Sequence, residues 1–190
     1  MKGYRDQPIF GGNDAIFHST NDQIRLYTVP RSVQRTPQDT TKASTWKTAE
    51  PEAVSNFSAT AYYFAKILQE RLKVPVAVIN ISYGGSPVEA FMDAETLNAF
   101  PEIQVPSPTD TSRLNNRNAT VLYNGMLGAF LGYTIKGCLW YQGESNNDRP
   151  KQNETLLPAF VKQNREQSGQ GDFPFNYCQI APNNNYNYSA

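Results

Sequence analysis

The sequence predicts an α/β fold in which helices alternate with strands of a parallel sheet. The clearest helical pattern spans residues 55–72, where apolar side chains recur at three- and four-residue steps. Three short and largely apolar runs, residues 74–81, 134–141 and 174–180, are typical of strands covered on both faces. Helical and strand patterns follow one another along the chain, as they do in right-handed α/β folds.

The other segments are assigned from periodicity and from turn residues. Residues 24–29 alternate apolar and polar side chains and predict a strand that ends before Pro30. The first 22 residues and residues 31–51 lack periodicity and are predicted to be loops. Further helices are predicted at residues 93–100, with Asp93 as the N-cap, and at residues 120–131 and 156–167.

Length and charge exclude several function classes. The chain has 190 residues, which suits one domain, and 17 Lys and Arg balance 17 Asp and Glu. Nucleic-acid binding requires clustered basic residues, so we expect no nucleic-acid partner. No run of about 18 apolar residues is present, so we expect no membrane-spanning helix. Polar residues follow Met1, which predicts that this chain carries no signal peptide.

Few residues can serve as metal ligands or as a catalytic base. Cys138 and Cys178 each lie in an apolar strand pattern, which favours two buried thiols over a disulfide. His18 is the only histidine and precedes the first predicted strand. We therefore expect no metal and no cofactor.

Two candidate site loops follow consecutive predicted strands, at the edge of a parallel sheet where ligands bind. The first loop contains Gly84 and Gly85, whose backbone can approach a ligand closely and point N–H groups at a developing negative charge. The second loop gathers polar side chains behind an aromatic pair: Gln142, Glu144, Ser145 and Asn146. Each loop is equally consistent with an ordinary turn.

Three ordered blocks carry a family resemblance: residues 57–91, residues 122–126 followed by 135–146, and residues 169–175 with 179–182. In order and spacing they resemble the sialate O-acetylesterase family of carbohydrate esterases. The resemblance covers most of the chain from Ile24 onward. It implies a flavodoxin-like, three-layer α/β/α parallel sheet of the SGNH hydrolase type.

The resemblance also implies that acetyl esters on sugars are hydrolysed by Ser–His–Asp chemistry. By motif position, Gly84, Gly85 and Gln142 would form the oxyanion hole. The residues expected to face an O-acetylated sugar are Tyr83, Glu144, Ser145 and Asn146.

The chain departs from the family pattern where the nucleophile and the base are expected. No Gly-Gln-Ser-Asn-Met motif and no Asp-x-x-His motif is present, and His18 matches neither. We therefore expect residues 1–190 to be one esterase domain, incomplete at both ends, without its nucleophile strand or its Asp-x-x-His segment. An uncovered sheet edge would favour a homo-oligomer, and the family implies a periplasmic or secreted location.

Three alternatives remain open at this point. A non-catalytic relative could bind sugars by stacking them on aromatic residues: Tyr83, Phe91, Trp140 and Tyr141. Ser86 could act as a nucleophile with His18, although the Gly-x-Ser-x-Gly pattern is missing. Glu89 and Glu144 could form the carboxylate pair of a glycoside hydrolase.

Overall fold

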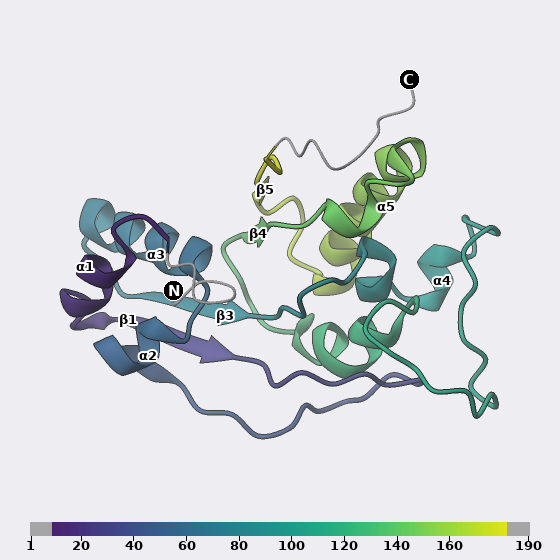
Figure 1. Ribbon diagram of the computed structural model, residues 1–190, viewed down its shortest axis with the longest axis horizontal. Helices are drawn as coiled ribbons and strands as arrows, with labels where there is room; N and C mark the ends of the chain where they lie inside the picture. Colours follow the sequence, from purple (N-terminus) through teal and green to yellow (C-terminus); the bar gives the residue numbers. More distant parts are fainter. Residues whose placement is uncertain (1–8, 182–190) are drawn as a thin grey trace. The chain divides into compact units, whose positions relative to one another are not determined.

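The computed structural model describes residues 9–181, which fall into two units. Of these residues, the first unit comprises 9–30 and 42–82, and the second comprises 31–41 and 83–181. Each unit has its own small sheet with helices (Figure 1). The protein is therefore a mixed α/β structure, as predicted. The three-layer arrangement and the single-domain organisation stay predictions.

The sheet of the first unit has the order β2-β1-β3. Strand β1 (Asn21–Thr28) pairs antiparallel with β2 (Lys47–Ala49) and parallel with β3 (Val76–Asn80). Ile24 and Leu26 alternate with exposed neighbours along β1 and are 1% and 3% exposed, which confirms the predicted strand. The expectation that residues 74–81 are covered on both faces is wrong, because every described side chain of β3 is at least partly exposed. Among the strands described within residues 9–181, β3 pairs with β1 alone and lies at the edge of the sheet.

Helix α3 (Ala59–Leu72) packs against β1 and β3 (Figure 1). It begins at Ser58, whose hydroxyl accepts a hydrogen bond from the Ala61 N–H, and ends at Lys73, which has a left-handed backbone. Tyr62 and Ala65 face the core. The predicted helix is confirmed, although its start lies four residues beyond the predicted one.

Three short elements of the first unit were missed: α1 (Gly12–Phe17), β2 and α2 (Pro51–Ser55). The first two lie in segments predicted to be loops, and α2 lies between the loop predicted at 31–51 and the helix predicted from residue 55. Each is too short to show a full period of apolar residues, so periodicity cannot detect it. The core of this unit nevertheless includes side chains from two of them, Ala49 and Val54, which are both 0% exposed.

The second unit consists of short turns of helix, one long helix and a two-stranded parallel sheet (Figure 1). Its elements are η1 (Val88–Phe91), α4 (Ala94–Leu97), η2 (Tyr123–Leu127), η3 (Gly128–Phe130), β4 (Cys138–Trp140), η4 (Glu144–Asn146), α5 (Pro150–Ser168) and β5 (Phe175–Tyr177). Asp93 caps α4 by accepting from the Thr96 N–H, as predicted, but the helix ends at Leu97. The predicted strands 134–141 and 174–180 form only in part. The expectation that they are covered on both faces is wrong, because no side chain of β4 or β5 is fully buried.

Two predicted helices of the second unit differ from the observed ones. Helix α5 begins at Pro150, six residues before its predicted start, because proline at the first helical position loses no hydrogen bond and the first turn is polar. It ends at Gly169, which has φ 64°. The segment predicted as a helix at residues 120–131 contains a π-helix, η2, and a 3₁₀ turn, η3. No helix within residues 9–181 is long and apolar enough to cross a membrane.

Candidate active site

The first candidate loop exposes two glycines. Gly84 and Gly85 follow β3 in the chain, and Gly85 has φ 79°, a conformation that favours glycine. Within residues 9–181, neither of the two glycine N–H groups donates to a protein acceptor. These N–H groups are therefore available to an oxygen atom of a ligand.

Asn116 holds this loop in place. Its side-chain Nδ2 donates to the Gly84 carbonyl and to Ser86 Oγ, both at 3.0 Å. The Ser86 hydroxyl donates in turn to the Tyr83 carbonyl at 2.7 Å. The Tyr83 and Gly84 carbonyls of the loop are thus occupied, whereas its glycine N–H groups have no acceptor within residues 9–181.

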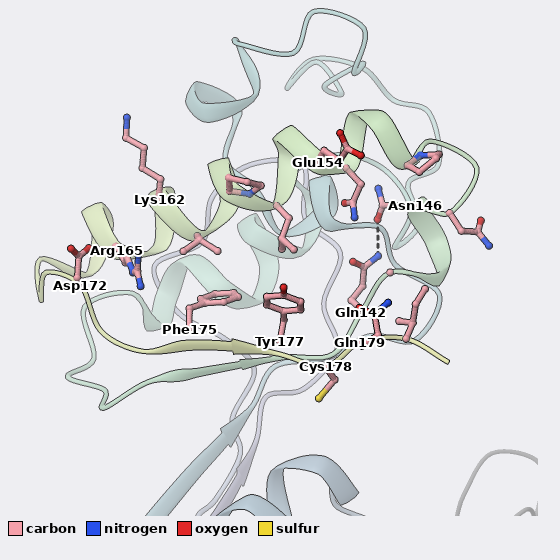
Figure 2. A pocket seen from close by; sticks show the side chains of 18 of the residues that line it. Gln142, Asn146, Glu154, Lys162, Arg165, Asp172, Phe175, Tyr177, Cys178 and Gln179 are labelled. Carbon is pink, nitrogen blue, oxygen red and sulfur yellow. Dashed lines mark hydrogen bonds and ion pairs between the residues drawn. The ribbon is translucent and has the colours of Figure 1, made fainter. Parts of the chain in front are cut away.

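Asn146 joins the two candidate loops. Its Oδ1 accepts from the Val88 N–H at 2.9 Å and from Gln142 Nε2 at 2.7 Å, and its Nδ2 donates to Glu89 Oε2 at 2.9 Å (Figure 2 draws the bond to Gln142). The residue is 1% exposed. A carboxamide with all of these partners is suited to connecting buried groups rather than to contacting a sugar.

The buried carboxylate of Glu89 also accepts from Arg149. The Arg149 guanidinium lies 2.9 Å from Glu89 Oε1, and the side chain of Glu89 is 7% exposed. Burial lowers the pKa of Arg149, but the hydrogen bond from Arg149 to Glu89 and the charges of Glu89 and Asp148 outweigh this effect and raise the pKa overall. Arg149 therefore stays charged, and Glu89 has a permanent counter-charge.

Gln142 is part of the same network. Its Nε2 donates to the Ser86 carbonyl at 3.2 Å as well as to Asn146. Both acceptors are oxygens, which fixes the orientation of the amide. Both amide hydrogens are thus engaged in this structure, and Gln142 holds the two loops together.

The remaining candidate residues lie at the surface of the unit. Glu144 is exposed, Ser145 is half-buried, and Tyr83 is half-buried with the Arg31 guanidinium carbon 5.0 Å from its ring centroid. Sequence reasoning missed Asn116, Arg149 and Arg31. Their partners lie 30 or more residues away along the chain, so no local pattern signals them.

The aromatic residues are divided between core and surface. Phe91 is 5% exposed, and its ring meets the ring of Trp140 at 5.8 Å in an edge-to-face contact. Trp140 also packs on Phe160 at 4.5 Å. The hypothesis that a sugar stacks on Phe91 is therefore wrong, because the Phe91 ring is buried against Trp140. Tyr83 and Tyr141 have exposed surface.

A groove of about 1050 Å³ runs between α5 and β5 (Figure 2). Phe175 and Tyr177 point toward α5, where Leu157 and Val161 complete an apolar lining (Figure 2). The groove reaches the candidate loops only through Gln142, Gly143, Asn146 and Asn147. Neither Gly84 nor Gly85 lines it.

The two cysteines are free, as predicted, but only Cys138 is shielded. Burial raises the pKa of the Cys138 thiol to about 12. The expectation that Cys178 is buried is wrong, because it follows the last residue of β5 and is exposed.

We expect Ellman's reagent to label Cys178 at least about a hundredfold faster than Cys138 at pH 8, because the thiolate is the reacting species. The Cys178→Ser variant should react only slowly, at a rate that rises about tenfold per pH unit between pH 7 and 9. The Cys138→Ser variant is the control. Equal rates for the two single variants would contradict the described burial of Cys138.

The geometry does not favour Ser86 as a nucleophile or Glu89 as a glycoside hydrolase carboxylate. The Ser86 hydroxyl donates to a backbone carbonyl rather than to a base, and Ser86 is 4% exposed. Glu89 is engaged by Asn146 and Arg149 and is not free to act as an acid. No cluster of three or more potential metal ligands occurs within residues 9–181.

Comparison with known proteins defines the family. Residues 28–190 match the family described as SASA, carbohydrate esterase, sialic acid-specific acetylesterase. The chain belongs to this family, which confirms the resemblance found in the sequence blocks.

Its relatives are acetylesterases of greater length. The chain is 31% identical over 132 residues to the sialate O-acetylesterase of Homo sapiens, covering 65% of this chain and 25% of that protein. It is 28% identical over 161 residues to the Mus musculus protein of the same name, covering 65% and 29%. The chain thus spans between 25% and 29% of the length of these relatives.

A solved structure is also similar. The crystal structure of a carbohydrate acetylesterase from Xanthomonas citri superposes with a TM-score of 0.77 at 31% identity, over 88% of this chain and 36% of that chain. The mixed α/β fold described above is therefore similar to a carbohydrate acetylesterase fold.

Proposed function

We propose that this chain forms the oxyanion-binding and sugar-facing part of a carbohydrate O-acetylesterase that removes acetyl groups from sugars of the sialate type. The observation that carries the proposal is the exposed pair Gly84 and Gly85, whose N–H groups have no acceptor within residues 9–181. A tetrahedral intermediate of ester hydrolysis bears a negative oxygen that such donors stabilise. Membership in the esterase family supports the same reaction.

In the proposed mechanism, a serine attacks the acetyl carbonyl and a histidine paired with an aspartate accepts its proton. Gly84 and Gly85 donate to the oxyanion. Gln142 joins them by exchanging one of its two present acceptors for the substrate oxygen. Tyr83, Glu144 and Ser145 face the sugar, and Asn146 acts through the loops it connects.

The nucleophile and the base are proposed to lie outside these 190 residues. The absence of both family motifs and the 25% coverage of the human relative support this. We further propose, from the family resemblance, a complete three-layer SGNH-type domain in the longer protein and a periplasmic or secreted location. An association of copies is proposed where a sheet edge is uncovered. No nucleic acid or membrane partner is proposed.

The test is hydrolysis of p-nitrophenyl acetate and of a 9-O-acetylated sialic acid by this chain and by a version extended to the length of its relatives. We expect turnover only in the extended protein. Within it, Gln142→Ala should lower kcat by about 10²–10³, while Asn147→Ala leaves kcat unchanged. Turnover by the 190-residue chain would overturn the placement of the nucleophile, and inactivity of both would overturn the esterase proposal.

A further inference from the structure

Three segments of the second unit, residues 31–38, 83–88 and 113–124, contain four arginines: Arg31, Arg35, Arg113 and Arg117. Carboxylates flank these segments at Asp39, Glu89 and Asp110, and Asp110 pairs with Arg35. Within residues 9–181, the arginines of these segments that form no ion pair are Arg31, Arg113 and Arg117.

Hydrogen bonds hold the three segments together. Asn116 donates to the Gly84 carbonyl, the Gln34 N–H donates to the Val121 carbonyl at 3.1 Å, and Asn124 Nδ2 donates to the Arg35 carbonyl at 2.9 Å. The arginines of these segments are thus attached to the loop that presents the glycine N–H groups.

The arginines of this unit differ in their partners. Arg35, Arg149 and Arg165 each form an ion pair with a carboxylate. Within residues 9–181, Arg31, Arg113 and Arg117 are exposed and form no ion pair. Of these three, Arg31 has a ring contact, because its guanidinium carbon lies 5.0 Å from the centroid of the Tyr83 ring.

A stacked guanidinium keeps its N–H edges free for a planar anion. Arginine binds a carboxylate through two parallel hydrogen bonds, and stacking on an aromatic ring reduces the entropy lost on binding. Tyr83 directly precedes Gly84, so the guanidinium rests on the residue next to the glycine pair in the chain. One sugar could present its acetyl group to the glycines and a carboxylate to the arginine.

We infer that Arg31 is the specificity-determining residue that binds the carboxylate of an acidic, O-acetylated sugar. This inference rests on the proposed function, because it uses the same glycine loop. It adds a residue that selects acidic over neutral sugars, and it assigns Tyr83 the role of supporting Arg31. Arg117 adds long-range attraction without a fixed contact.

The experiment is an NMR titration of the ¹⁵N-labelled chain, followed at the Gly84 and Gly85 amide signals. The probes are the methyl glycoside of 9-O-acetyl-N-acetylneuraminic acid and its carboxamide, which differ only in the charged group. We expect the acid to bind about tenfold more tightly than the carboxamide, and the difference to shrink as salt is raised. Arg31→Gln should remove the difference, and Arg31→Lys should restore part of it.

The controls separate this inference from the proposed function. Arg71→Gln, in the last turn of α3, removes an exposed arginine from the other unit and should leave the preference unchanged. Equal binding of acid and carboxamide by the native chain, or an unchanged preference in Arg31→Gln, would overturn the role of Arg31 while leaving the sugar site in place. If neither probe moves the glycine signals, the sugar site itself is wrong and both proposals fail.

Discussion

Replacing Asn146 with alanine is expected to lower the free energy of unfolding by about 3–4 kcal/mol. The substitution removes three hydrogen bonds at once and leaves the Val88 N–H, the Gln142 amide and one oxygen of Glu89 without these partners. Each buried group without a partner costs about 1–3 kcal/mol, and entry of water reduces the sum. Urea unfolding measures the change.

Asn147→Ala is the matched control, because Asn147 follows in the chain and forms no hydrogen bond within residues 9–181. We expect it to change the free energy of unfolding by no more than about 0.5 kcal/mol. Similar effects of the two substitutions would show that Asn146 does not connect the loops.

An isosteric change, Asn146→Asp, tests the same network through pH. It replaces the donor 2.9 Å from Glu89 Oε2 with a second carboxylate oxygen. Two adjacent carboxylates disfavour ionisation of both, so one pKa of the folded variant is raised. When the pKa of a carboxyl group is raised in the folded state, the protein loses stability as the pH rises through that pKa. The variant should therefore be less destabilised, relative to the native chain, at pH 4.5 than at pH 7.5. A deficit independent of pH would contradict the expected contact between the carboxylates.

The second large effect is expected at Gly125, where alanine should lower the free energy of unfolding by about 2–4 kcal/mol. A Cβ atom there would lie 2.5 Å from the Ser32 carbonyl oxygen and 2.9 Å from its carbon. Both atoms belong to the backbone, so no side-chain rotation relieves the overlap. The hydrogen bond from the Gln38 N–H to the Asn124 carbonyl, at 2.9 Å, holds the same two segments together and would be strained.

Gly132→Ala is the control for this substitution. Gly132 is exposed, and a Cβ atom added there meets nothing within 4 Å. The change should leave stability unchanged or raise it by up to about 1 kcal/mol, since alanine restricts the unfolded chain. Thermal and urea unfolding of both variants give the comparison. Equal stability of the two would mean that residues 31–41 do not pack against η2.

The closeness of Ser32 to Gly125 also links stability to binding. Arg31 precedes Ser32, so displacement of this segment would move Arg31 away from Tyr83. Gly125→Ala is therefore expected to weaken the preference for the acidic sugar in any fraction that remains folded. Gly132→Ala should not.

Local patterns predicted the elements with clear periods. Strand β1 and helix α3 were predicted because alternating burial and three- and four-residue steps are visible within one segment. The segment around η2 was predicted as an ordinary helix, although the chain forms a π-helix there. The close approach of the Ser32 backbone to Gly125 is a contact between segments more than 90 residues apart, which a helical period cannot reveal.

The sequence by itself determined the family, the places of β1 and α3, and the two loops that form the candidate site. These properties depend on patterns within short runs of neighbouring residues. Only the tertiary structure decided the roles within the site: Asn146 and Gln142 connect the loops, Asn116 holds the glycines, and Arg31 lies over Tyr83. The physical reason is that a hydrogen bond or a ring contact depends on distance in space, and these partners come from segments that only folding brings together.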